Sequence, residues 1–113
     1  MRIRNTTRNT VVAEDASVAD TYFSRLRGLL GEKKLPQGNA LVITPCNSIH
    51  TFFMQFPIDA LFLDKEHKVV KMLEKVVPFR VSGIYFKADI VIELPQGAVA
   101  RSLTHLADTI SFE

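Results

Sequence analysis

The chain has 113 residues, of which 47% are hydrophobic and 23% are charged, and this composition is typical of an ordinary globular domain rather than of a disordered or membrane chain. Its formal net charge of +2 is too small to predict a nucleic-acid partner. The single cysteine, Cys46, excludes a disulfide within the chain, and no apolar run approaches the roughly 20 residues of a membrane-spanning helix. The first ten residues lack the apolar segment of a signal peptide. We therefore expect one domain over residues 1–113, cytoplasmic, with neither a membrane nor a specific nucleic-acid partner.

In the first third of the chain, the spacing of hydrophobic residues changes from a strand-like to a helix-like pattern. Residues 1–13 combine apolar side chains with a central run of turn formers, which favours a short β-hairpin. Ser17 and Asp20 then have the spacing of a capping box, and apolar side chains recur every 3.6 residues as far as Gly31, which can end a helix. This pattern predicts a helix over residues 17–30.

The remaining sequence has the apolar, β-branched composition of strands separated by turns. The predicted strands are residues 40–43, 49–56, 58–64, 69–77, 90–94 and 109–112. The tetrapeptide LPQG occurs at 35–38 and again at 94–97, and its proline and glycine suit a type I turn in both places. The connector 78–88 contains aromatic side chains and could cover a groove. These features predict an α+β, mostly β domain, in which about five to seven strands form a barrel-like mixed or antiparallel sheet and the helix packs across one opening or face.

The segment from Cys46 to Asp64 places polar residues within apolar, strand-like sequence. An unpaired polar group in such surroundings costs roughly 1–3 kcal/mol, so each one needs a partner. On an extended strand His50 lies on a largely apolar face, which suits either a buried structural histidine or a ligand contact. By the same alternation Asp59 shares a face with Leu61 and Leu63, so it either accepts backbone hydrogen bonds or contacts a ligand.

Several kinds of chemistry find little support in the sequence. On an extended strand Cys46 and His50 are separated by roughly 13 Å, too far for a nucleophile and its base unless a turn lies between them. The histidines have no recognised metal-ligand spacing, and the chain contains neither GxxxxGK nor GxGxxG. We therefore expect no metal site and no cofactor.

Four sequence blocks together resemble a known family. They are Arg27-Gly28-Leu29, PCNSIHTFFMQFPIDALFLD at 45–64, Val77-Pro78 with Arg80, and IELPQG at 92–97. In this order they resemble the prokaryotic family called domain of unknown function 192 (DUF192). The resemblance implies a compact β-rich domain with a short helix, but no established activity, cofactor or substrate. It also implies a glycine just before the aspartate of the last strand, where this chain has Ala107.

The site residues expected from the sequence favour binding. We expect a polar small molecule or a short partner segment in a groove beside the SIHTFFMQFPID block, lined by His50, Thr51, Asp59, Arg80 and Glu93. Glu93 is included because, like Asp59, it alternates with apolar strand residues. Arg80 would join His50 and Asp59 in one pocket. The alternative is a small hydrolase-like or transferase-like enzyme with His50 or Asp59 as general base and Arg80 as electrostatic stabiliser. A purely structural subunit is the third alternative.

Overall fold

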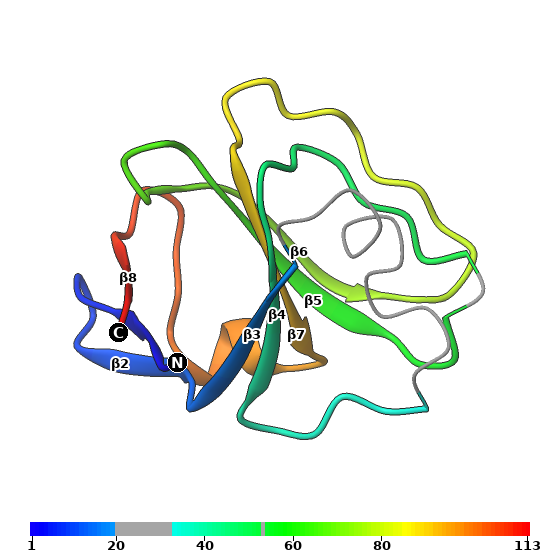
Figure 1. Ribbon diagram of the computed structural model, residues 1–113, viewed down its shortest axis with the longest axis horizontal. Helices are drawn as coiled ribbons and strands as arrows, with labels where there is room; N and C mark the ends of the chain where they lie inside the picture. Colours follow the sequence, from blue (N-terminus) through cyan, green and yellow to red (C-terminus); the bar gives the residue numbers. More distant parts are fainter. Residues whose placement is uncertain (20–32, 53) are drawn as a thin grey trace.

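The computed structural model describes residues 1–19, 33–52 and 54–113, and this part of the chain forms two sheets and one short helix (Figure 1). The elements are β1 (Ile3–Asn5), β2 (Thr10–Ala13), β3 (Asp15–Ala19), β4 (Asn39–Ile43), β5 (Ile58–Leu63), β6 (Val69–Val76), β7 (Ile90–Pro95), α2 (Ala98–Arg101) and β8 (Ile110–Phe112). The small sheet has the order β2-β1-β8, and the large sheet has the order β3-β4-β7-β5-β6. The architecture is α+β with mainly β structure, as predicted.

The sheet organisation agrees with the prediction in one respect and differs in two. The large sheet is mixed, one of the two predicted arrangements, because β3 pairs with β4 in parallel while the other pairs are antiparallel. However, β3 and β6 remain edge strands, so the sheet is not closed into a barrel. The described residues also form eight strands rather than five to seven, because β1, β2 and β8 make a separate small sheet.

Most individual strands were predicted well. The hairpin over residues 1–13 is formed by β1 and β2, which pair antiparallel. The strands predicted at 40–43, 58–64, 69–77, 90–94 and 109–112 are confirmed as β4 to β8, with each end within about one residue of its predicted place. Apolar side chains on alternating faces therefore identified these elements.

The helix predicted over residues 17–30 is wrong at its start. Ser17, Val18 and Ala19 belong to β3, where they pair with β4, and the Val18 side chain is 48% exposed rather than buried on a helix face. Pairing with a strand distant in sequence therefore outweighs the local capping-box spacing. The rest of the predicted helix lies outside the described residues.

The strand predicted over residues 49–56 is also absent from the described part of that segment. His50 forms one isolated antiparallel bridge with Val81, and the neighbouring residues adopt turns and bends. Two-sided apolar sequence suggested a central strand, but these side chains cover a sheet instead of entering it. Consistently, Ile49 and Met54 are buried against the large sheet whereas His50 is exposed.

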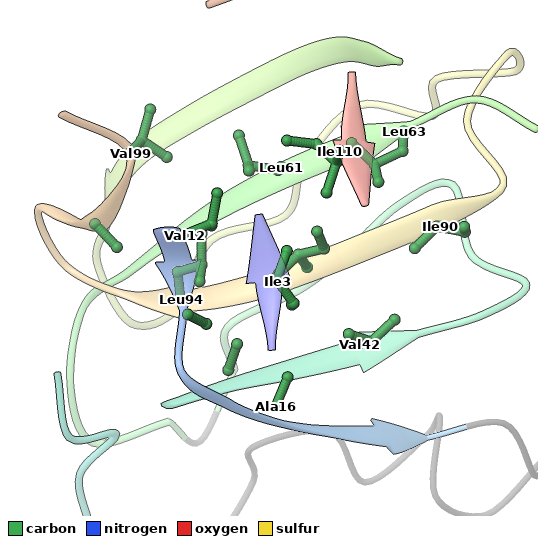
Figure 2. Close-up of a cluster of buried hydrophobic side chains, with 14 of the residues drawn as sticks. Ile3, Val12, Ala16, Val42, Leu61, Leu63, Ile90, Leu94, Val99 and Ile110 are labelled. Atoms are coloured by element: carbon green, nitrogen blue, oxygen red, sulfur yellow. The ribbon is translucent and has the colours of Figure 1, made fainter. Parts of the chain in front are cut away.

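One face of the large sheet packs against the small sheet and α2. Figure 2 shows this cluster, with Ile3, Val12 and Ile110 from the small sheet, Leu61, Leu63, Ile90, Leu94 and Val42 from the large sheet, and Val99 from α2. The opposite face buries Ile58, Phe62 and Val91 beneath residues of the segments 44–57 and 77–89. The two faces of β5 and β7 therefore look into different environments.

Candidate functional site

Asp59 connects three elements through its buried side chain. Its Oδ1 accepts the Lys75 N–H (2.9 Å), and its Oδ2 accepts the N–H groups of Gly97 (3.0 Å) and Val99 (3.1 Å). Asp59 opposes an irregularity in β6, because Ile58 pairs with Val76 while the next pair joins residues 60 and 73. This bulge frees the Lys75 N–H to point at the carboxylate. Asp59 thus satisfies backbone donors and has no exposed surface.

Thr51 joins the two segments that cover the far face of the large sheet. Its Oγ1 donates to the Val77 carbonyl (2.7 Å) and accepts the Arg80 N–H (2.9 Å), while its backbone N–H donates to the Arg80 carbonyl (2.8 Å). Its own carbonyl accepts the Phe79 N–H (3.0 Å). In Figure 1 the segments run side by side, with 77–88 in yellow. His50, Thr51 and Arg80 are therefore brought together.

Phe79 has an unusual backbone conformation at this junction. Its φ of 64° lies in the left-handed region, which a bulky residue adopts only when its surroundings compensate for the strain. The hydrogen bonds between Thr51 and residues 79 and 80 provide that compensation. The backbone hydrogen bonds therefore fix the conformation of residues 79 and 80 and with it the direction of their side chains.

The two segments expose a group of large apolar side chains, which we call the loop surface. Its apolar members are Phe52, Phe79, Val81, Ile84 and Phe86. The rings of Phe52 and Phe79 pack edge to face at 6.2 Å, and Phe86, further along the segment, is 86% exposed. Exposed large apolar side chains that share two hydrogen-bonded segments are a feature of interaction sites.

The charged side chains within the two segments have one sign as far as residue 88. Residues 44–57 and 77–88 contain no aspartate or glutamate, although Asp89 follows directly, while Arg80 and Lys87 are exposed within the second of these ranges. None of the ion pairs among the described residues involves Arg80 or Lys87. The loop surface is therefore apolar and cationic.

Glu93 lies on the opposite face of the sheet from Asp59. On β7 it follows the alternation of Val91, and its direct neighbours on the adjacent strands are Leu41 and Ala60. Its Oε2 is buried without a hydrogen-bond partner among the described residues. Burial raises the pKa of Glu93 from 4.5 to about 7, because the charged form loses its hydration.

The five residues expected to line one groove consequently occupy three places. His50, Thr51 and Arg80 belong to the paired loops. Asp59 faces the side of Leu61 and the small sheet, and Glu93 is enclosed on the other side of the sheet. The structure does not bring Asp59 into a pocket with His50 and Arg80, because the large sheet lies between Asp59 and the loops.

Most of the loop surface was not predicted from the sequence. Phe52 falls within the strand predicted over residues 49–56, and of the connector residues only Arg80, Tyr85 and Phe86 stand out from the sequence as unusual in a loop. A signal was nevertheless available, because the two segments combine aromatic residues and cations with a complete lack of acidic residues. The sequence does not show that these side chains are exposed, and their exposure is seen only in the structure.

Three further observations concern the described residues. The Cys46 thiol donates to the Ser48 carbonyl (3.0 Å). No group of three or more histidine, cysteine, aspartate or glutamate side chains in the described part of the chain could hold a metal ion. No helix of residues 1–19, 33–52 and 54–113 is long and apolar enough to cross a membrane.

This small, mainly β domain is similar in fold and in sequence to proteins of other organisms. A solved protein of unknown function from Novosphingobium aromaticivorans has the same fold, with a TM-score of 0.84 over 98% of this chain and 82% of its own, at 17% sequence identity. A UPF0127 protein of Thermococcus sibiricus is 33% identical over 96% of this chain and 73% of its own. UPF0127 protein PH1112 of Pyrococcus horikoshii is 32% identical over 97% of both chains.

The family follows from the sequence match. Residues 3–112 match the model of DUF192, described as "Uncharacterized ACR". The chain belongs to the DUF192 family, which confirms the resemblance carried by its sequence blocks. Membership of this family agrees with the fold, and the description of the family names no activity.

Proposed function

We propose that this domain binds a segment of a partner protein that carries acidic side chains beside apolar ones, and that the loop surface is its binding site. The observation that carries the proposal is the exposure of five large apolar side chains on two hydrogen-bonded, acid-free segments. Aromatic and arginine side chains are the groups that contribute most to protein interfaces.

The order of the loops supports recognition rather than accidental exposure. Thr51 fixes both segments, and Tyr85 packs its ring on Phe62 at a centroid distance of 4.8 Å, which attaches the end of the loop to the sheet. A surface that is already ordered loses little conformational freedom on binding. Phe79, Val81 and Phe86 thus present apolar area at a low entropic cost.

The charges favour an acidic partner. Arg80 and Lys87 have no carboxylate partner in the described part of the chain, so an acidic segment would complement them. A second copy of this chain would be a poor partner in a two-fold contact, because both contacting surfaces would then carry the same positive charges of Arg80 and Lys87. His50, beside Phe52 at a ring distance of 5.9 Å, lies at the rim of the same surface.

The geometry gives less support to the alternative of an acid–base enzyme. A general base must reach the proton that it abstracts, whereas the Asp59 carboxylate is fully buried and accepts three backbone N–H groups. Glu93 is enclosed between neighbouring strands on the other face. His50 and Arg80 remain accessible, and binding uses them without a catalytic partner.

Affinity capture with matched variants tests the proposal. Immobilised wild-type domain, a Val81→Ser/Phe86→Ser variant and an Arg80→Glu/Lys87→Glu variant would be exposed to a lysate of the source organism. The control is Leu103→Ser/Leu106→Ser, which removes two side chains that are each 58% exposed outside the loop surface. All these side chains are exposed, so folding should be preserved.

The proposal predicts a protein that is retained by the wild type and the control, lost from both loop variants and released by salt. Retention of the same proteins by all four baits, or of none by the wild type, would contradict it. Capture of membrane vesicles without a protein would instead assign the loop surface to lipid.

A further inference from the structure

A second feature lies at the two LPQG turns, which meet in space although they are distant in sequence. Gln37 of the first turn donates through Nε2 to the Gln96 carbonyl of the second (3.3 Å). Between the turns lies a cavity of about 480 Å³, within the roughly 300–1,000 Å³ of typical small-ligand sites. Its lining consists of Lys34, Leu35, Gln37, Phe56, Pro57, Pro95, Gln96, Gly97 and Arg101.

The charged side chains that line the cavity among residues 1–19, 33–52 and 54–113 are both positive. They are Lys34 and Arg101, and neither forms an ion pair within the described part of the chain. Asp59 lies beneath the lining residue Gly97, but its buried carboxylate accepts backbone N–H groups, and Glu14 in a smaller neighbouring cavity is paired with Arg2 at 3.2 Å. An anion entering the larger cavity would therefore meet two cations and no carboxylate side chain among its described lining residues.

Arg101 is held in place with donors to spare. Its Nη2 donates to the Gln96 carbonyl (3.1 Å) and to Gln37 Oε1, which leaves Nε and Nη1 without an acceptor among the described residues. Gly97 makes this position possible, because a Cβ there would lie 2.8 Å from Arg101 Nη1. The Nε–H and Nη1–H groups can each donate a separate hydrogen bond to an anion, because they lie on different sides of the guanidinium and both of its bidentate faces include the occupied Nη2.

The cavity also has apolar lining. Leu35, Phe56, Pro57 and Pro95 contribute it. We infer that this cavity binds a small organic anion, whose carboxylate or phosphate contacts Arg101 and Lys34 and whose apolar part packs on Phe56 and the prolines. The inference is independent of the loop surface, since it uses other residues.

Nuclear magnetic resonance titration of the whole ¹⁵N-labelled chain tests the inference. The probes are benzoate and phenyl phosphate, with benzyl alcohol as the uncharged control of similar shape. Both anions should cause saturable shifts of the backbone amides of Gln37, Gly97 and Arg101, whereas benzyl alcohol should not. Tighter binding of benzoate would indicate a carboxylate ligand, and tighter binding of phenyl phosphate a phosphate ester.

Charge-removing variants locate the site. Lys34→Gln and Arg101→Gln should each weaken binding of the preferred anion about tenfold, the usual effect of losing a hydrogen bond to a charged group. Lys65→Gln, which alters an exposed lysine outside the cavity, should leave the affinity unchanged. The spectra themselves verify that each variant is folded. Absence of saturable shifts with both anions, equal binding of benzyl alcohol, or unchanged affinity in Lys34→Gln and Arg101→Gln would each overturn the inference.

Discussion

Two buried carboxyl groups on adjacent strands have opposite roles because their surroundings differ. Asp59 receives three backbone N–H groups, so its buried oxygens are satisfied. Glu93, beside Ala60 and Leu41, buries an oxygen that has no partner among the described residues. Asp59 therefore stabilises the folded chain, whereas the charged form of Glu93 opposes folding.

Asp59→Asn should lower the free energy of unfolding by about 1–3 kcal/mol, because the amide NH₂ group of asparagine cannot accept the N–H that a carboxylate oxygen accepted. Chemical denaturation measures the change, and Asp15→Asn on the exposed side of β3 is the control. A folded Asp59→Asn variant of unchanged stability would show that these three hydrogen bonds contribute little.

Glu93 predicts a pH dependence of stability. Its pKa is about 7 in the folded chain and close to 4.5 when hydrated, so between these values the folded state retains a proton that the unfolded state has lost. Stability should therefore be fully present below pH 4.5 and fall as the pH rises to 7, by an amount on the order of 3 kcal/mol. Glu93→Gln should remove this slope, whereas Glu74→Gln on the exposed part of β6 should retain it. Identical pH profiles for wild type and Glu93→Gln would contradict the assignment.

At the scale of single elements, positive φ angles mark where the chain departs from ordinary geometry. Gly38 and Gly97 have φ of 90° and 93° at the ends of the two LPQG turns, which fits a repeated turn chemistry. Ala107, three residues before β8, has a φ of 72°, at the position where the family resemblance implied a glycine. The turn thus keeps its conformation despite the alanine, since the Ala107 N–H donates to the Val69 carbonyl (2.8 Å).

Ala107→Gly should stabilise the chain by about 0.5–1 kcal/mol. Relief of the left-handed alanine conformation is worth roughly 1–2 kcal/mol, and the added freedom of glycine in the unfolded state offsets part of it. Thermal and chemical denaturation would show the increase. The exposed Ala100 in α2 provides the opposite case, because Ala100→Gly should destabilise the helix. A lowered midpoint for Ala107→Gly would show that the turn carries no strain.

At the scale of the whole molecule, alternating apolar residues correctly predicted which face of a strand each side chain occupies. Features that depend on pairing between distant segments could not be predicted in this way. The faces of Asp59 and Glu93 followed correctly from their neighbours in β5 and β7. The prediction of a helix beginning at residue 17 was wrong, because residues 17–19 pair with β4 as part of a strand. The candidate groove failed because alternation gives the face of a residue only within its own strand, and it cannot show which face the covering loops occupy.

The core that unites the two sheets provides a prediction for the whole fold. Leu61 is fully buried between the large sheet and the small sheet (Figure 2). Leu61→Ala should lower the free energy of unfolding by about 2–5 kcal/mol through lost burial and a residual cavity. An unchanged denaturation midpoint would remove Leu61 from the core.

Site-specific photo-crosslinking in living cells tests the proposed docking role of the loop surface most directly. A benzophenone side chain would replace Phe86, which is 86% exposed, and in a control strain it would replace Leu103, which is 58% exposed on another surface. We predict one discrete protein adduct at Phe86 that disappears in an Arg80→Glu/Lys87→Glu background and is absent at Leu103. No adduct at Phe86, or the same adduct at both positions, would contradict a partner-binding role for the loop surface.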